Sequence, residues 1–128
     1  MTERRWIGEA LILAIHDEQI AEHGGRAGLR DHGLLQSALA RAVNRAAYGD
    51  PDAFDLAAAY AFGLARNRPF VDGNKRTAFV AAAVFLLDNG YELDVDDVSV
   101  VQVILALSDG AMSEGELAAW LREHARRS

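Results

Sequence analysis

The stretch NKRTAFVAAAVFLLDNG, residues 74–90, combines a basic beginning with a nearly continuous run of apolar side chains. Its apolar positions cover almost the whole circumference of a helix, which is typical of a central helix buried on most faces. Asn89 and Gly90 suit the end of such a helix, because both residue types readily adopt the left-handed conformation found there. The sequence therefore predicts a buried helix that starts near Asn74 and ends before Asn89.

Apolar residues recur at helical spacing on the N-terminal side of this segment. They predict two early helices, around residues 7–15 and 34–43, joined by the surface loop EHGGRAGLRDHG at residues 22–33. The glycines of that loop permit backbone conformations that a helix cannot use. A third helix is expected from about Asp52 to Arg66, with Pro51 suited to its first turn.

The C-terminal side continues the helical pattern after a short interruption. Residues 91–95 alternate apolar and acidic side chains and could be a short extended piece, although no partner strand is identifiable. Asp96 to Leu107 is expected to form another helix. Ser113 and Glu116 have the spacing of a capping box for a last helix, with which the chain is expected to end. The fold class is therefore all-α, a compact single-domain bundle of about six helices over residues 1–128.

Composition narrows the class of protein. The chain has 128 residues, of which 51% are hydrophobic, enough for one domain with a real core. It has no cysteine, which excludes disulfide scaffolds, thiolate metal sites and thiol nucleophiles. The formal net charge of −6 disfavours direct nucleic-acid binding. Glu9 interrupts the apolar N-terminal stretch and no apolar window is long enough for a membrane span, so we expect a soluble, cytoplasmic protein.

The loop before the central helix, NRPFVDG at residues 67–73, has the features of a phosphate site. The first amide groups of a helix lack internal partners and lie at the positive end of its dipole, so they attract anions. Gly73 lets a ligand approach the backbone closely, and Lys75 and Arg76 add two positive charges. Pro69 biases Arg68 away from the helical conformation. Together these features predict a cradle for phosphate groups.

Three more residues of the loop have predicted roles. Asp72 is placed where a carboxylate can hold a magnesium ion that bridges phosphate oxygens. Asn74 could donate a hydrogen bond to a phosphate oxygen or fix the loop. Phe70 is a large apolar side chain in a polar loop, which suggests an anchor packed inward. A simpler alternative is that Asp72 only caps the helix and that Lys75 and Arg76 are solvated surface charges, since a short DGNKR string is weak support for a site.

The segment RPFVDGNKRTA resembles the signature of the Fic/Doc family, which reads HxFx(D/N)xNKR in the Doc branch and HxFx(D/E)GNGRxxR in the Fic branch. Agreement with the Doc pattern runs from Phe70 to Arg76. Four other segments are similar to Doc-type toxins: IHDEQIAEHGG at 15–25, GLLQSALARA at 33–42, AAYAFGLARN at 58–67 and SDGAMSEGELAAWL at 108–121. The resemblance covers most of the chain.

This resemblance implies an all-α toxin of a toxin–antitoxin system that uses ATP. In the Doc branch the implied reaction is phosphorylation of a threonine on elongation factor Tu, which blocks translation; in the Fic branch it is transfer of AMP to a protein hydroxyl. Lys75 stands where the Fic pattern has glycine and favours the Doc reaction. The family pattern assigns magnesium to Asp72 and the nucleotide phosphates to Gly73, Asn74, Lys75 and Arg76. It also implies an antitoxin whose disordered C-terminal segment folds onto the toxin.

Arg68 occupies the position where the family has its general-base histidine. A guanidinium group stays protonated and cannot accept the proton of a target hydroxyl. Loss of a positioned base typically costs roughly 10²- to 10⁴-fold in rate, so we expect an inactive or nearly inactive chain. Two explanations remain open: a detoxifying substitution in a Doc-type kinase, or a natural variant that serves as a non-catalytic module for binding a nucleotide or a partner.

Several other side chains are candidate site residues. His16 with Asp17 could imitate a metal pair, but no further ligands follow at helical spacing, so a structural or surface role is expected for His16. His23 and His32 bracket the glycine-rich loop, which the family geometry would place near the site, where it could help to clamp a target peptide. Arg66 could complement its helix dipole or reach the nucleotide. The aromatic residues are expected in the core: Trp6, Tyr60, Trp120 and the phenylalanines.

Overall fold

The computed structural model describes residues 4–128, apart from the side chain of Ser108. Its described part contains six helices and two short strands, which confirms the predicted all-α bundle. In chain order the elements are α1 (Glu9–His23), α2 (His32–Ala46), α3 (Ala53–Asn67), α4 (Asn74–Asp88), β1 (Tyr91–Leu93), α5 (Asp97–Ser108), α6 (Glu114–His124) and β2 (Ala125–Arg127).

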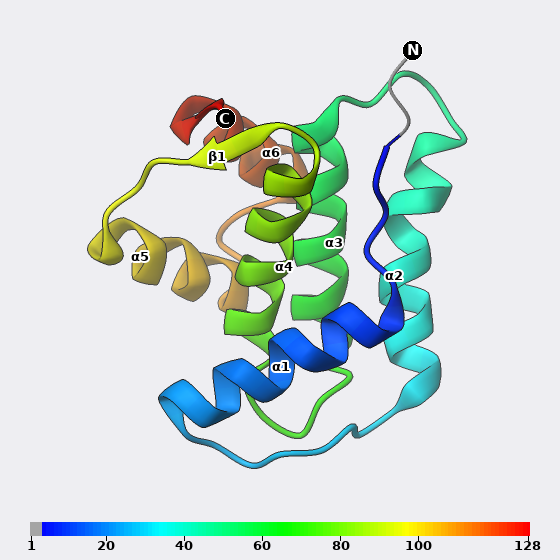
Figure 1. Ribbon diagram of the computed structural model, residues 1–128, viewed down its shortest axis with the longest axis vertical. Helices are drawn as coiled ribbons and strands as arrows, with labels where there is room; N and C mark the ends of the chain where they lie inside the picture. Colours follow the sequence, from blue (N-terminus) through cyan, green and yellow to red (C-terminus); the bar gives the residue numbers. More distant parts are fainter. Residues whose placement is uncertain (1–3) are drawn as a thin grey trace.

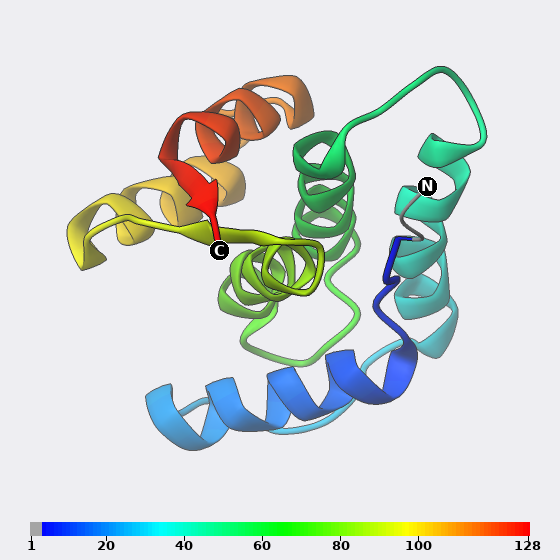
Figure 2. The ribbon, with the colours of Figure 1, turned by 45° about the horizontal axis from the view of Figure 1, so that its top comes forward.

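Helices α3 and α4 lie side by side at the centre of the molecule (Figure 1). Helix α2 packs against α3, while α1 crosses one side of the central pair and α5 and α6 lie on another side (Figure 2). Small side chains allow close packing here: a Cβ atom at Gly63 of α3 would lie 3.2 Å from the carbonyl oxygen of Ala38 in α2. The buried face of α4, which includes Ala78, Phe85 and Leu86, confirms the predicted central helix.

The end of the chain differs from the prediction. Helix α6 stops at His124, and the next three residues form β2, so the expectation of a helix up to the C-terminus is wrong. Strand β2 pairs antiparallel with β1, in the register Tyr91 opposite Arg127. The extended piece at residues 91–95 thus has a partner after all, one that a local pattern could not reveal because it lies more than thirty residues away.

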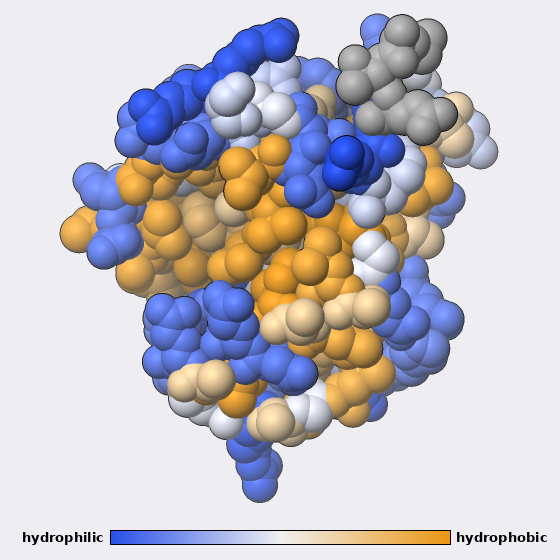
Figure 3. All heavy atoms as spheres, viewed as in Figure 1, coloured by the Kyte–Doolittle hydropathy of each residue, from blue (hydrophilic) through white to orange (hydrophobic). Residues whose placement is uncertain are grey.

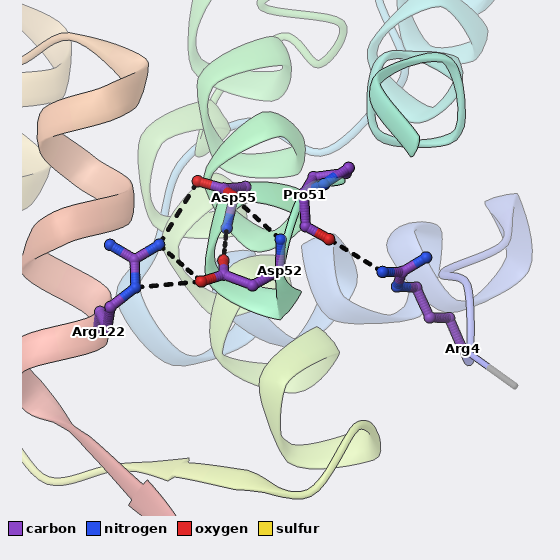
Figure 4. Close-up of polar contacts among 5 residues, drawn as sticks. All are labelled: Arg4, Pro51, Asp52, Asp55 and Arg122. Carbon is purple, nitrogen blue, oxygen red and sulfur yellow. Dashed lines mark hydrogen bonds and ion pairs between the residues drawn. The ribbon is translucent and has the colours of Figure 1, made fainter. Parts of the chain in front are cut away.

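The start of α3 is fixed by side chains from three parts of the chain (Figure 4). Asp52 is the N-cap residue, and it forms a reciprocal capping box with Asp55. Pro51 therefore precedes the cap instead of lying in the first helical turn as predicted, and its carbonyl oxygen accepts a hydrogen bond from Arg4 at 2.9 Å. Arg122 of α6 donates to Asp52 at 2.8 Å. The capping box predicted for Ser113 and Glu116 is present at the start of α6.

The aromatic residues are not all in the core. Tyr60 is fully buried, and its hydroxyl oxygen accepts a hydrogen bond from the backbone amide of Ile7 at 3.1 Å. Trp6, in contrast, is 40% exposed, so its predicted place in the core is wrong. Its ring lies 6.1 Å from that of Phe85 and covers the edge of the core. In the described chain no helix has the length and apolar character needed to cross a membrane.

Candidate functional site

The loop between α3 and α4, residues 68–73, is called the motif loop below. A pocket of about 370 Å³ opens between this loop and α5. The motif loop and the first turn of α4 form one wall, and Val101, Ile104 and Leu105 of α5 contribute the other. The pocket brings together six of the residues singled out in the sequence: Arg68, Asp72, Gly73, Asn74, Lys75 and Arg76.

The first turn of α4 has an open N-terminus. Gly73 is its N-cap residue, in the left-handed conformation with φ 76° and ψ 14°, and no side chain in the described part of the chain caps the first amide groups. Asp72 does not cap the helix, so that part of the simpler alternative is wrong. The other part, that Lys75 and Arg76 are solvated surface charges, is not contradicted, because both side chains are exposed. Its Oδ2 atom instead accepts a hydrogen bond from the backbone amide of Arg26 at 2.9 Å. The positive end of α4 therefore stays available to an anion in the pocket.

The charges that line the pocket are mostly positive. Arg68, Lys75 and Arg76 contribute three cations, and none of them has an ion-pair partner among residues 4–128. Of the described residues that line the pocket, Asp72 alone carries a carboxylate. This balance favours a ligand with several negative charges, such as a polyphosphate.

Asn74 fixes the shape of the motif loop. Its side-chain oxygen accepts from the backbone amide of Phe70 at 2.9 Å, and its side-chain nitrogen donates to the carbonyl oxygen of Phe70, also at 2.9 Å. Phe70 itself is only 1% exposed. Of the two roles predicted for the Asn74 side chain, the structure shows the one of holding the loop, so a phosphate contact at this position rests on the backbone amide.

Arg68 has an unusual backbone conformation. It is the C-cap residue of α3, and with φ 50° and ψ 57° it is the one non-glycine residue with a positive φ in the described chain. The left-handed conformation costs an L-residue roughly 1–2 kcal/mol, so neighbouring groups must impose it. The guanidinium group of Arg30 supplies two such contacts, donating to the carbonyl oxygens of Arg68 at 2.9 Å and Asn67 at 3.0 Å.

The glycine-rich loop between α1 and α2 lies against the motif loop. Leu29 forms an antiparallel bridge with Phe70, and the amide of Val71 donates to the carbonyl oxygen of Gly28 at 3.1 Å. The expected position of this loop near the site is thus observed, while its role in clamping a target peptide stays a prediction. His23 lines a neighbouring pocket, and His32 contacts Glu9 at the start of α1.

Other sequence candidates lie away from the pocket or have different roles. Arg66 does not line the pocket; its guanidinium group lies 5.1 Å from the centre of the Phe62 ring. His16 is buried and Asp17 exposed, and the described residues contain no group of three His, Asp or Glu side chains suited to a metal ion. Sequence reasoning missed Arg30 and the α5 wall, because neither belongs to a local motif.

The sequence of this chain is similar to those of known proteins. The model of the Fic/DOC family matches residues 6–86, which is more than half of the chain and includes the whole motif loop. The chain is 33% identical to Protein kinase doc of Escherichia phage P1 over 119 residues, 92% of this chain and 94% of that protein. It is 49% identical to Toxin Doc of Mycolicibacterium smegmatis over 76 residues, 57% of this chain and 58% of that protein.

Proposed function

The chain belongs to the Fic/DOC family, and we propose that it is a Doc-type toxin with an intact nucleotide site and a catalytic step blocked by Arg68. The reaction of the unblocked site is transfer of the γ-phosphate of ATP to a threonine hydroxyl of elongation factor Tu, which stops translation in the cytoplasm. The single observation that carries the proposal is the open start of α4, surrounded by three cations that have no ion-pair partner within the described chain.

The pocket residues fit a nucleotide with its magnesium ion. The amide groups of the first turn of α4 would donate to phosphate oxygens, and Lys75 and Arg76 would pair with their charge. Asp72 would hold the metal, since only its Oδ2 atom is hydrogen bonded within the described chain and a carboxylate oxygen is the ligand that magnesium prefers. A bound magnesium ion neutralises part of the phosphate charge.

Arg68 affects binding and transfer in opposite ways. Its positive charge next to Lys75 and Arg76 strengthens the attraction for phosphates. It cannot take the proton from an attacking hydroxyl, because a guanidinium group remains protonated near neutral pH. The chain should therefore bind ATP and transfer phosphate roughly 10²- to 10⁴-fold more slowly than a chain with a histidine at this position.

Two alternatives compete with phosphorylation. Transfer of AMP, the reaction implied for the Fic branch, is disfavoured by Lys75, which stands in place of a glycine in that branch. The relative named a protein kinase, which is similar over nearly the whole chain, also supports phosphate transfer. A non-catalytic binding module is the second alternative. In a blocked enzyme, replacement of Arg68 by histidine would restore transfer, whereas in a binding module it would not.

A neighbouring groove supports an antitoxin as partner. A pocket of about 640 Å³ lies between α1, α4 and α5 and shares Arg76 with the phosphate site. Val101 of α5, which lines this groove, is more than half exposed, and Figure 3 shows a broad apolar area on this face of the molecule between hydrophilic borders. Since Glu22 and Asp97 line the groove, we expect an amphipathic antitoxin helix with basic residues beside its apolar face.

Val100→Glu should abolish co-purification with the antitoxin; undiminished co-purification contradicts this placement.

Substitution of Arg68 tests the proposed reaction. Arg68→His is incubated with elongation factor Tu and ATP labelled at either the γ- or the α-phosphate. We expect γ-label on a threonine, at a rate roughly 10²- to 10⁴-fold above that of the parent. Arg68→Asn is the matched control, because it removes the same cation without supplying a base. Incorporation of α-label would favour AMP transfer, and no label from either nucleotide would favour the binding module.

A further inference from the structure

Buried polar side chains cluster around one place in the molecule. Among the described residues, the polar or charged side chains classed as buried are His16, Gln19, Asn74 and Thr77. Asn74 and Thr77 belong to the first turn of α4, and His16 lies on α1, against the motif loop. His16 has no role in the proposed reaction, yet it is only 2% exposed.

His16 contacts the motif loop in two ways. Its ring stacks on that of Phe70, with 3.8 Å between the ring centres and an angle of 5° between the planes. Its Nε2 atom lies 2.7 Å from the carbonyl oxygen of Asp72. A carbonyl oxygen only accepts hydrogen bonds, so Nε2 carries the proton and donates it. The imidazole thus contacts both Phe70, the anchor of the loop, and Asp72, the residue expected to hold magnesium.

Asp72 is consequently held from two sides. His16 fixes its carbonyl oxygen, and the backbone amide of Arg26 fixes its carboxylate through Oδ2 at 2.9 Å. A Cβ atom added at Gly73 would lie at van der Waals distance, 3.6 Å, from Nε2 of His16, so the imidazole lies directly beside the motif loop. Without the His16 hydrogen bond, Asp72 would be held through its carboxylate alone.

We infer that His16 is a positioning residue that orients Asp72 toward the magnesium ion of a bound nucleotide; this inference rests on the nucleotide site proposed above. A position that had only to fill space against Phe70 would be filled by phenylalanine without the cost of burying a polar ring. The N–H group of His16 offsets that cost by a hydrogen bond to the one pocket residue with a carboxylate. Partners that orient a metal-binding side chain commonly change metal affinity by about 10- to 100-fold when they are removed.

Two substitutions separate the ring from its donor. His16→Phe keeps a planar ring on Phe70 and removes the N–H group. His16→Gln removes the ring and keeps an N–H donor that reaches about as far along the side chain. If His16 only supports packing, phenylalanine is the better replacement; if it positions Asp72, glutamine is.

The first measurement compares ATP affinity with excess magnesium and with a chelator, for the parent and both variants. The parent should bind more tightly with magnesium. We expect His16→Phe to lose most of this gain, about tenfold in affinity, while its metal-free binding and its melting temperature are maintained. His16→Gln should retain most of the gain. Equal magnesium gains in the parent and in His16→Phe overturn the inference, and so does loss of the gain in both variants together with a lowered melting temperature.

The second measurement does not depend on nucleotide binding. Hydrogen exchange of the Phe70 and Val71 amides, both hydrogen bonded in the structure, reports on the motif loop. Exchange should be faster in His16→Phe than in the parent and restored in His16→Gln, with the amides of α3 unchanged; unchanged exchange at Phe70 and Val71 overturns the inference. If the parent binds no ATP at all, the proposed nucleotide site is wrong, and the exchange result alone decides whether His16 holds the loop.

Discussion

The two central helices begin in opposite ways. The start of α3 is closed: Asp52 accepts from the amide of Asp55 at 2.9 Å, Asp55 accepts from the amide of Asp52 at 3.0 Å, and Arg122 pairs with both carboxylates. The start of α4 has Gly73 in the cap position and no capping side chain among the residues that the structure describes. A capped helix start contributes about 1 kcal/mol to stability. Under the proposed function, α4 forgoes this contribution and keeps its amide groups for the nucleotide.

The sequence contains two clusters of basic residues, and they differ in the same way: Arg66, Arg68, Lys75 and Arg76 lie around the motif loop, and Arg122, Arg126 and Arg127 form the C-terminal cluster. In the C-terminal cluster, Arg122 pairs with Asp52, Arg126 pairs with Glu92, and Arg127 lies over the ring of Tyr91. Around the motif loop, Lys75 and its basic neighbours have no ion-pair partner within residues 4–128. One cluster therefore stabilises the fold, and the other is available to bind phosphate.

The largest effect is expected from removal of a cation at the open helix start. Lys75→Ala should weaken binding of magnesium and ATP about 10- to 100-fold, because a hydrogen bond to a charged group contributes roughly 1.5–3 kcal/mol. The free energy of unfolding should hardly change. Calorimetric titration measures the binding, with Arg126→Ala as a control that removes the same charge from the other cluster. Equal losses in both variants would mean that only net charge matters.

The opposite result is expected at the closed helix start. Asp52→Ala should lower the free energy of unfolding by about 1–2 kcal/mol, because it removes the cap of α3 and the partner of Arg122. ATP affinity should stay the same. Urea unfolding measures the change, and Asp50→Ala removes an equal charge two residues away as a control. A loss of ATP affinity in Asp52→Ala would contradict the separation of the two helix starts.

Arg68 concerns both ligand binding and stability, since it lines the proposed site and its left-handed backbone is strained. Arg68→Gly should be more stable than Arg68→Ala by about 1 kcal/mol, because glycine adopts this conformation without a steric penalty. Both substitutions remove the same guanidinium group, so their difference isolates the backbone. Urea unfolding of the pair gives the value, and greater stability of the alanine variant would show that the backbone here is not left-handed.

The smallest effect concerns pH. Burial raises the pKa of Asp52, but hydrogen bonds from the Asp55 amide and from Arg122 outweigh it and leave this pKa below its usual range. The stabilisation by the carboxylate is thus fully present above about pH 5 and is lost as the pH falls through the lowered pKa. The difference in unfolding free energy between the parent and Asp52→Asn should shrink in acid. A constant difference from neutral to acid pH would show that the charge of Asp52 contributes nothing.

Much of the fold could be read from local patterns in the sequence. The central helix at residues 74–88 and the capping box at Ser113 are encoded within a few neighbouring residues, and both were predicted. The pairing of β1 with β2 was missed, because Tyr91 and Arg127 come together only through the fold. Trp6 was misplaced for a similar reason, since helical spacing says nothing about which segment covers its ring.

The site likewise combines residues that a local motif reveals with residues that only the fold brings together. The motif loop carries its own signature, so Asp72 and Lys75 could be proposed as site residues from the sequence. The groups that shape this loop come from elsewhere: Arg30 holds the end of α3, and His16 holds the carbonyl of Asp72. Histidine on an apolar helix face has many explanations, and only the folded chain shows that its donor reaches the motif loop.

The central claim is that the open start of α4 binds a nucleotide while Arg68 slows transfer. The most direct test is a calorimetric titration of the unaltered chain with ATP and magnesium, followed by incubation of the same sample with elongation factor Tu and γ-labelled ATP. We predict saturable binding at a single site and labelling of the elongation factor that is roughly 10²- to 10⁴-fold slower than with Arg68→His. Absence of saturable binding, or labelling by the chain that still carries Arg68 at the rate of Arg68→His, would contradict the account.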